Sequence, residues 1–139
     1  MNIGIDVHGT IDYDPRAWKL VIDLLLALGH KIHIVSGPEE EKIIKRLQNL
    51  RIPVAGLYIE SMADYIKEES GAKYWYKDGS IWTTDEIWWS TKAEICRRRG
   101  IDVMIDDQVD YYLAKWRDIA PNTSFILYQR GRFVCEHKT

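Results

Sequence analysis

The sequence has few cysteines, no long apolar run and little net charge. Cys96 and Cys135 lie far apart and fit no CxxC or Cys/His spacing, so a zinc site is unsupported and two reduced thiols are expected. The longest apolar run, around 24–28, is far shorter than the roughly 20 residues that span a bilayer. The first residues, MNIGID, lack the basic and apolar segments of an export signal. We therefore expect a cytoplasmic protein without membrane contact.

Length and composition indicate one domain. A chain of 139 residues with 46% apolar content can build one full core but not two comfortable ones. A formal net charge of −2 gives no general reason to expect a polyanionic partner. Six tryptophans and eight tyrosines exceed what a small core needs, so we expect some of them to be exposed on a flap or contact surface. Residues 1–139 are therefore interpreted as a single domain.

Strand-like and helix-like segments alternate in the first half of the chain. The strand-like segments are 2–7, 31–36 and 54–60, and the helix-like segments are 15–28, 38–50 and 61–70. This alternation predicts a mostly parallel sheet flanked by helices, with right-handed crossovers. The expected fold class is therefore α/β, with a three-layer, Rossmann-like arrangement.

The alternation is interrupted by an aromatic-rich segment at 73–84. Two short aromatic runs flank Asp78-Gly79, which is a strong two-residue hairpin signal, so we expect an inserted β-hairpin. The segments that follow are a helix at 85–99 ended by Gly100, a buried strand at 101–106, a helix near 109–118, and closing strands in SFILYQR and RFVCE.

Polar side chains follow three of the predicted strands. They are Asp6, His8 and Thr10 after the first strand, Ser36 and Gly37 after the second, and Asp106, Asp107 and Asp110 after the strand at 101–106. The carboxyl ends of parallel strands form one edge of a sheet, where ligands bind. Neighbouring carboxylates repel one another unless a cation or a shared proton compensates, and a ligand set made of oxygens suits Mg²⁺. The sequence therefore predicts a magnesium site at this edge.

A carboxylate at such a site can also act as a nucleophile on phosphorus, forming an aspartyl-phosphate. Asp6 is the candidate. Thr10, Ser36, loop amides and a lysine could supply the hydrogen bonds and positive charge that phosphoryl oxygens need. Lys92 is well placed for this role, because it lies on the helix that leads into the strand at 101–106.

The layout resembles the haloacid dehalogenase (HAD) superfamily of phosphohydrolases. Its first motif, hhhhDxDGT, is matched by IGIDVHGT at 3–10, and its second, a strand ending in Ser or Thr, by IHIVSG at 32–37. Its lysine motif is matched by Lys92 in STKAEIC, and its acidic last motif by VMIDDQVD at 103–110. Four motifs in order cover most of the chain. Since little sequence separates them, the resemblance is to a small, nearly capless member with a DxHGT variant of the first motif.

The resemblance implies a role for each matched residue. Asp6 would be the nucleophile and a Mg²⁺ ligand, and residue 8 would offer its backbone carbonyl to the metal. Ser36 and Lys92 would hold the phosphoryl group, in a loop shaped by Gly9, Thr10 and Gly37. Asp107 would bind the metal directly, and Asp106 or Asp110 would orient the metal or Lys92. The implied activity is that of a Mg²⁺-dependent phosphatase.

His8 departs from the phosphatase pattern, in which the second aspartate of DxD is the general acid/base. Histidine exchanges protons near neutral pH, and such a group contributes roughly 10²- to 10⁴-fold to catalysis. We therefore expect His8 to be an unusual acid/base. The alternative is a slow or inactive HAD-like protein that binds phosphate and Mg²⁺ and acts through a partner.

Other interpretations of single residues stay open. Ser36 and Asp107 could simply cap the helices that follow them, and Asp110 could be a first-turn acid. The arginines at 97–99 could complement their helix end or form a nucleotide patch. Trp75, Tyr76 and Trp82 could pack on the domain or form a flap on which a base stacks. A small phosphorylated substrate is expected, with a nucleotide or nucleic-acid end slightly favoured over a sugar phosphate.

Overall fold

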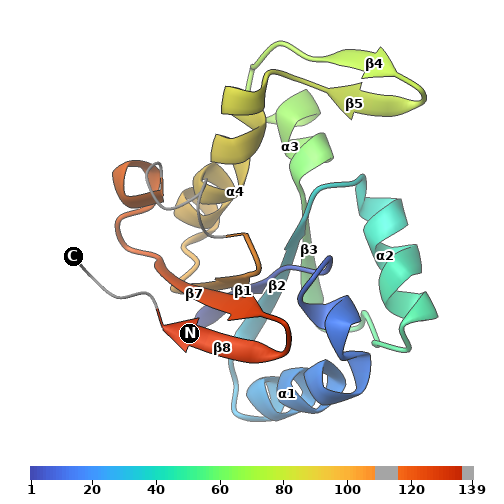
Figure 1. The fold of residues 1–139 in the computed structure, drawn as a ribbon, viewed down its shortest axis with the longest axis vertical. Helices are drawn as coiled ribbons and strands as arrows, with labels where there is room; N and C mark the ends of the chain where they lie inside the picture. Colours follow the sequence, from blue (N-terminus) through green and yellow to red (C-terminus); the bar gives the residue numbers. More distant parts are fainter. Residues whose placement is uncertain (109–115, 136–139) are drawn as a thin grey trace.

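The computed structural model describes residues 1–108 and 116–135 and shows a six-stranded sheet flanked by helices, with a separate two-stranded hairpin (Figure 1). The main sheet consists of β1 (Asn2–Ile5), β2 (Lys31–Ser36), β3 (Leu57–Ser61), β6 (Val103–Asp106), β7 (Ser124–Gln129) and β8 (Arg132–Cys135). The helices are α1 (Pro15–Ala27), α2 (Glu40–Asn49), α3 (Met62–Glu68) and α4 (Asp85–Arg99), with a 3-10 turn η1 (Ile11–Tyr13) before α1. The hairpin strands are β4 (Trp75–Lys77) and β5 (Ser80–Trp82).

The strands of the main sheet follow the order β3-β2-β1-β6-β7-β8. All neighbouring strands are parallel except β7 and β8, which are antiparallel. The chain builds outward from β1 to β2 and β3, and later returns to place β6 on the other side of β1. In open sheets of this kind, ligands bind at the carboxyl ends of the strands where the order reverses. The α/β class and the mostly parallel sheet are confirmed, and the reversal lies between β1 and β6.

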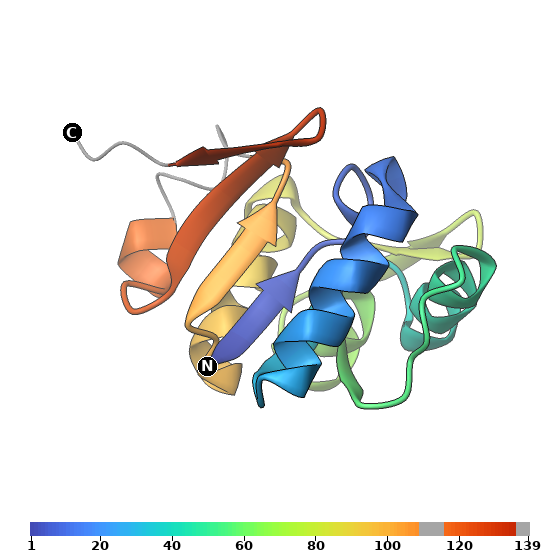
Figure 2. The ribbon, with the colours of Figure 1, turned by 90° about the horizontal axis from the view of Figure 1, so that it is seen from below.

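Apolar side chains alternate between the two faces of the sheet and form a core on each. Ile3 and Ile5 of β1 belong to the core covered by α1 and α2, whereas Met104 of β6 belongs to the core covered by α3 and α4. Figure 2 shows α1 on one face of the sheet and α4 behind the other. The expected three layers are therefore present.

Three of the predicted strands, 2–7, 54–60 and 101–106, end earlier or begin later in the structure, and the last of them begins at Val103 as β6. β1 stops at Ile5 rather than at residue 7, because the chain turns directly after Asp6. β3 begins at Leu57 rather than at residue 54, because Pro53 and Gly56, whose φ is 82°, keep the preceding residues in a turn. Of the helix predicted near 109–118, residues 109–115 lie outside the described part, and residues 116–119 are helical.

Helix α4 is capped at both ends, and of the two capping residues Gly100 was predicted from the sequence. The Thr84 hydroxyl accepts a hydrogen bond from the Ile87 amide at 3.3 Å, and Gly100 ends the helix in the left-handed conformation. The face of α4 against the sheet buries Lys92 and Cys96. The Cys96 thiol is free, as expected, and burial raises its pKa so that it stays protonated.

The hairpin predicted at 73–84 is present. Asp78 and Gly79 have φ values of 52° and 74°, as a two-residue turn with both central residues in the left-handed region requires. Ile81 anchors the hairpin, because it is buried against Ala63 and Ile66 of α3 and against Trp88. The hairpin projects from the domain at the end where α4 begins (Figure 1). No helix in the described part of the chain is long and apolar enough to cross a membrane.

Candidate active site

Asp6 and Asp106 lie next to each other at the point where the strand order reverses. β1 and β6 pair in register, with Ile5 opposite Ile105, and the Asp6 amide donates a hydrogen bond to the Ile105 carbonyl at 3.0 Å. Both aspartates follow or end a buried strand, and their exposed fractions are 5% and 0%. The two carboxylates that the sequence assigned to one site are therefore brought together.

Lys92 bridges these two carboxylates from helix α4. Its Nζ lies 2.9 Å from Asp6 Oδ1 and 2.6 Å from Asp106 Oδ2, and the lysine is only 4% exposed. The remaining oxygen of Asp106, Oδ1, accepts a hydrogen bond from the Gln108 amide at 3.0 Å. Removing one partner of a buried ion pair leaves an uncompensated charge, which costs roughly 3–5 kcal/mol. Such an arrangement fixes the ammonium group of Lys92 between the ends of β1 and β6.

Asp107 adds a third carboxylate to this pair. Asp6, Asp106 and Asp107 each offer an oxygen, and these oxygens lie within 4.8 Å of one another. Burial raises the pKa of Asp6 to about 8, because Lys92 offsets only part of the desolvation and the other two carboxylates oppose ionisation. Burial and the adjacent Asp106 also raise the pKa of Asp107.

This carboxylate cluster, defined as Asp6, Asp106 and Asp107, fits a divalent cation. One lysine compensates one negative charge, so full ionisation leaves two charges that need a proton or a cation. The donor set is made of oxygens alone, which Mg²⁺ prefers. Asp110, the other acid assigned to this site from the sequence, lies outside the described residues.

Gly9 allows the loop after β1 to approach the carboxylate cluster. Its φ is 79°, and a Cβ atom at this position would lie 2.1 Å from Asp107 Oδ2. A side chain is therefore excluded both by the backbone conformation and by the contact with Asp107. The neighbouring Thr10 is fully buried, and its hydroxyl has no hydrogen-bond partner among the described residues. An unsatisfied buried hydroxyl costs roughly 1–3 kcal/mol, so Thr10 is a good candidate for contact with a ligand oxygen.

Ser36 and Gly37 lie at the end of β2, beside this loop. Ser36 is 5% exposed and does not cap α2, which begins at Glu40 with Glu39 as its N-cap residue. The capping role for Ser36 is therefore wrong. Gly37 lies against the indole of Trp88, since a Cβ atom at Gly37 would be 3.0 Å from Trp88 Cζ2.

His8 lies at the rim of the site rather than inside it. Its side chain is 94% exposed, and Nδ1 lies 3.3 Å from Asp12 Oδ2. Asp12 Oδ1 also accepts a hydrogen bond from the Gly9 amide at 2.7 Å, and Arg46 approaches Oδ2 at 3.4 Å. Asp12 thus fixes the loop and holds the imidazole.

Sequence reasoning missed Asp12. The available signal was an acid placed three residues after a glycine in a turn, a spacing at which a carboxylate commonly accepts a backbone N–H.

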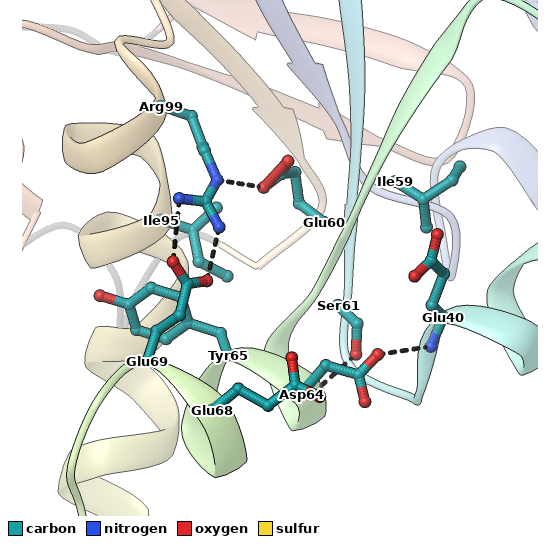
Figure 3. Close-up of a pocket in the computed structure, with 10 residues that line it drawn as sticks. All are labelled: Glu40, Ile59, Glu60, Ser61, Asp64, Tyr65, Glu68, Glu69, Ile95 and Arg99. Carbon is teal, nitrogen blue, oxygen red and sulfur yellow. Dashed lines mark hydrogen bonds and ion pairs between the residues drawn. The ribbon is translucent and has the colours of Figure 1, made fainter.

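The arginines at 97–99 make contacts within the domain. Arg97 pairs with Glu94, Arg98 lies over the ring of Tyr65, and Arg99 binds Glu60 and Glu69. Arg99 lines a cavity of about 210 Å³ beside β3, and half of its lining residues are acidic. Figure 3 shows the Arg99 side chain between Glu60 and Glu69. Burial alone would raise the pKa of Glu60, but His33 and Arg99 outweigh it and lower that pKa. No residue of the carboxylate cluster lines this cavity. Because the three arginines contact residues of the domain, they give no support to a nucleotide patch.

The aromatic side chains of the hairpin are exposed. The exposed fractions of Trp75, Tyr76 and Trp82 are 48%, 62% and 46%. The expectation that some aromatic side chains are exposed is therefore confirmed, and both alternatives for these three residues, packing on the domain and forming a flap, stay open. Whether they cover a substrate stays a prediction.

The fold and the site define an α/β protein with a mostly parallel, six-stranded sheet and a buried carboxylate–lysine cluster at its switch point. No family model matches the chain, and neither a curated protein nor a solved structure matches it. The function is therefore inferred from the geometry of the site.

Proposed function

We propose that the protein is a Mg²⁺-dependent phosphomonoester hydrolase of the HAD-like type that acts on a small phosphorylated substrate. The observation that carries this proposal is the contact of Lys92 with both Asp6 and Asp106, next to Asp107 at the switch point of the sheet. Buried carboxylates paired with a buried lysine are unusual outside sites that bind or transfer charged groups. A bound Mg²⁺ ion would balance the carboxylates, and Lys92 would balance charge on a bound phosphoryl group.

Asp6, Asp107 and the backbone carbonyl of residue 8 would hold the Mg²⁺ ion. Both oxygens of Asp106 already accept hydrogen bonds, from Lys92 and from the Gln108 amide, so Asp106 is better suited to orient the lysine. When bound, Mg²⁺ would neutralise charge on the carboxylates and on the phosphoryl oxygens. Thr10 and Ser36 would donate hydrogen bonds to those oxygens, and Lys92 would add positive charge beside them.

The reaction has two steps at Asp6. A carboxylate oxygen of Asp6 attacks phosphorus and forms a P–O bond, while the bond from phosphorus to the leaving oxygen breaks. The leaving oxygen takes a proton from His8. Water then attacks the phosphorus of the aspartyl-phosphate and gives a proton to His8, and the bond to Asp6 breaks. Asp6 and His8 return to their starting states, and inorganic phosphate is released.

The position of His8 supports this role. An exposed imidazole at the rim of the site can meet the leaving group of a substrate that enters from solvent. Asp12 holds the Nδ1 side of the ring, so Nε2 would exchange the proton, as in sites where an aspartate orients a catalytic histidine.

A phosphate-release assay on a panel of phosphomonoesters tests the proposal. We expect the wild type to release phosphate with Mg²⁺ and to lose this activity with EDTA and in Asp6→Asn. Asp23→Asn is a matched control, because Asp23 is a half-exposed carboxylate on α1 that pairs with Lys19. Its activity should equal that of the wild type.

A second candidate is a protein that only binds phosphate and Mg²⁺. It is favoured by one observation, which is that His8 replaces the aspartate that is the usual acid/base at this place. If the wild type releases no more phosphate than Asp6→Asn does while His8→Asp gains activity, the binding function replaces the hydrolase.

A further inference from the structure

A cavity lies between the hairpin and the start of α4, outside the carboxylate cluster. Its volume is about 300 Å³, and it is lined by Ser80, Ile81, Trp82, Thr83, Asp85 and Trp88. We call it the hairpin cavity. Its size is at the low end of ligand pockets and suits one planar ring system rather than a peptide.

Trp88 connects the hairpin cavity to the phosphoryl site. Its indole lines the cavity and also lies against Gly37, where an added Cβ atom would be 3.0 Å from Cζ2. Gly37 directly follows Ser36, which is proposed to donate a hydrogen bond to the phosphoryl oxygens. A substrate whose phosphate binds at Ser36 would therefore have its organic part next to the Trp88 indole.

The side chains of the hairpin cavity suit an aromatic ring with polar edges. Trp82 is 46% exposed, and its ring is held by a hydrogen bond from Nε1 to the Lys77 carbonyl at 3.2 Å and by the Lys77 ammonium 5.0 Å from the ring centre. A ring fixed in this way loses little entropy when another ring stacks on it. Ser80 and Asp85 add a hydroxyl and a carboxylate, which can bond the polar edge of a base.

The hairpin is also fixed to the rest of the protein. Thr83 donates a hydrogen bond from its hydroxyl to the Lys73 carbonyl at 2.7 Å, and Ile81 is buried against α3. The cavity is thus formed before a ligand arrives.

We propose that the hairpin cavity binds the nucleobase of a substrate whose phosphate lies at Asp6. This inference rests on the proposed function for the fate of the phosphate, but the base-binding site stands on its own contacts. The base can come from a free nucleotide or from the terminal nucleotide of a single strand, because both present the same ring at the same distance from a phosphate.

The test compares substrates with and without a base. The substrates are a nucleoside 5′-monophosphate, ribose 5-phosphate, and a single-stranded oligonucleotide with a 5′-phosphate. Stacking of a base on an aromatic side chain is worth about 5- to 150-fold. We expect the nucleotide to exceed ribose 5-phosphate in kcat/KM by about 10-fold or more. A further gain with the oligonucleotide would identify a nucleic-acid end as the source of the base, and no gain would identify the free nucleotide.

Variants show whether this preference depends on the hairpin cavity. Trp82→Ala should lower the ratio of the two kcat/KM values by about 5-fold or more, and Trp82→Phe should restore most of it. Tyr58→Ala is the matched control, because Tyr58 is 48% exposed on β3, away from the hairpin cavity. Its ratio should equal that of the wild type.

A binding measurement separates failure of the inference from failure of the proposed function. The nucleotide and ribose 5-phosphate are titrated into Asp6→Asn, with and without the additional Trp82→Ala change, by calorimetry. Tighter binding of the nucleotide that depends on Trp82 supports the inference even if no substrate is hydrolysed, in which case the hydrolase proposal fails alone. Equal affinity for the two compounds, or a preference that survives Trp82→Ala, overturns the inference whether or not phosphate is released.

Discussion

The affinity for Mg²⁺ should depend steeply on pH, because the cation must displace a proton from Asp6. Burial raises the pKa of Asp6 to about 8 in the metal-free protein. Below that pH the ionised fraction falls on the order of tenfold per pH unit, so the apparent association constant for Mg²⁺ should rise about 50-fold from about pH 6 to about pH 8. Above about pH 9 it should change little. Isothermal titration calorimetry in buffers of different protonation enthalpy measures the affinity and the released proton together.

The same carboxyl group links stability to pH with a defined sign. The pKa of Asp6 in the folded protein, about 8, lies above its ordinary value of 3.8. The contribution of this group to stability is therefore fully present below about pH 3.8 and is lost as the pH rises through about 8. Saturating Mg²⁺ should remove most of this loss, which thermal melts at several pH values would detect.

Asp6→Asn provides the control for this reasoning, because an amide has no proton to release. In that variant the Mg²⁺ affinity should keep only the smaller pH dependence that comes from Asp107, whose pKa is also raised. Mg²⁺ affinity that is constant between about pH 6 and pH 8 in the wild type, with no proton released, would refute the account of the cluster.

Three substitutions test other parts of the site. Gly9→Ala should lower both stability and Mg²⁺ affinity, because the added Cβ atom would meet Asp107. Gly29→Ala should lower stability alone, since its φ is also positive but nothing lies within 4 Å of the added Cβ atom. Calorimetry measures the Mg²⁺ affinity of both variants, and thermal melting measures their stability. Lys92→Met should destabilise the protein by about 3–5 kcal/mol in urea unfolding, and an unchanged midpoint would contradict the buried ion pairs. Asp12→Ala should cost about 0.5–1.5 kcal/mol in the same experiment, because the Gly9 amide loses its acceptor, and a loss below that range would show that Asp12 does not hold the loop.

Much of the fold was predictable because local signals and tertiary packing agree. Asp78-Gly79 forms the predicted hairpin turn, and Gly100 ends α4 where the sequence indicates. The errors lie at strand ends, as with β1, where the apolar Val7 belongs to the turn after Asp6 rather than to the strand.

The carboxylate cluster was predictable for a different reason. Asp6 and Asp106 follow or end apolar strands, and parallel pairing of β1 with β6 brings such positions together. The bridging contacts of Lys92 could not be derived from its helix position alone, since they depend on how α4 packs on the sheet. The contact between Asp12 and His8 could not be predicted from the sequence either, because it depends on the loop conformation that Gly9 permits.

The central claim is that Asp6 carries the phosphoryl group during the reaction. Mass spectrometry of protein quenched in acid during turnover, followed by digestion, tests it directly on the best substrate of the panel. The account predicts a phosphoryl group on the peptide that contains Asp6, present with Mg²⁺ and lost with EDTA. Turnover with a phosphoryl group on another residue, or with none on this peptide while substrate is still being consumed, would contradict it.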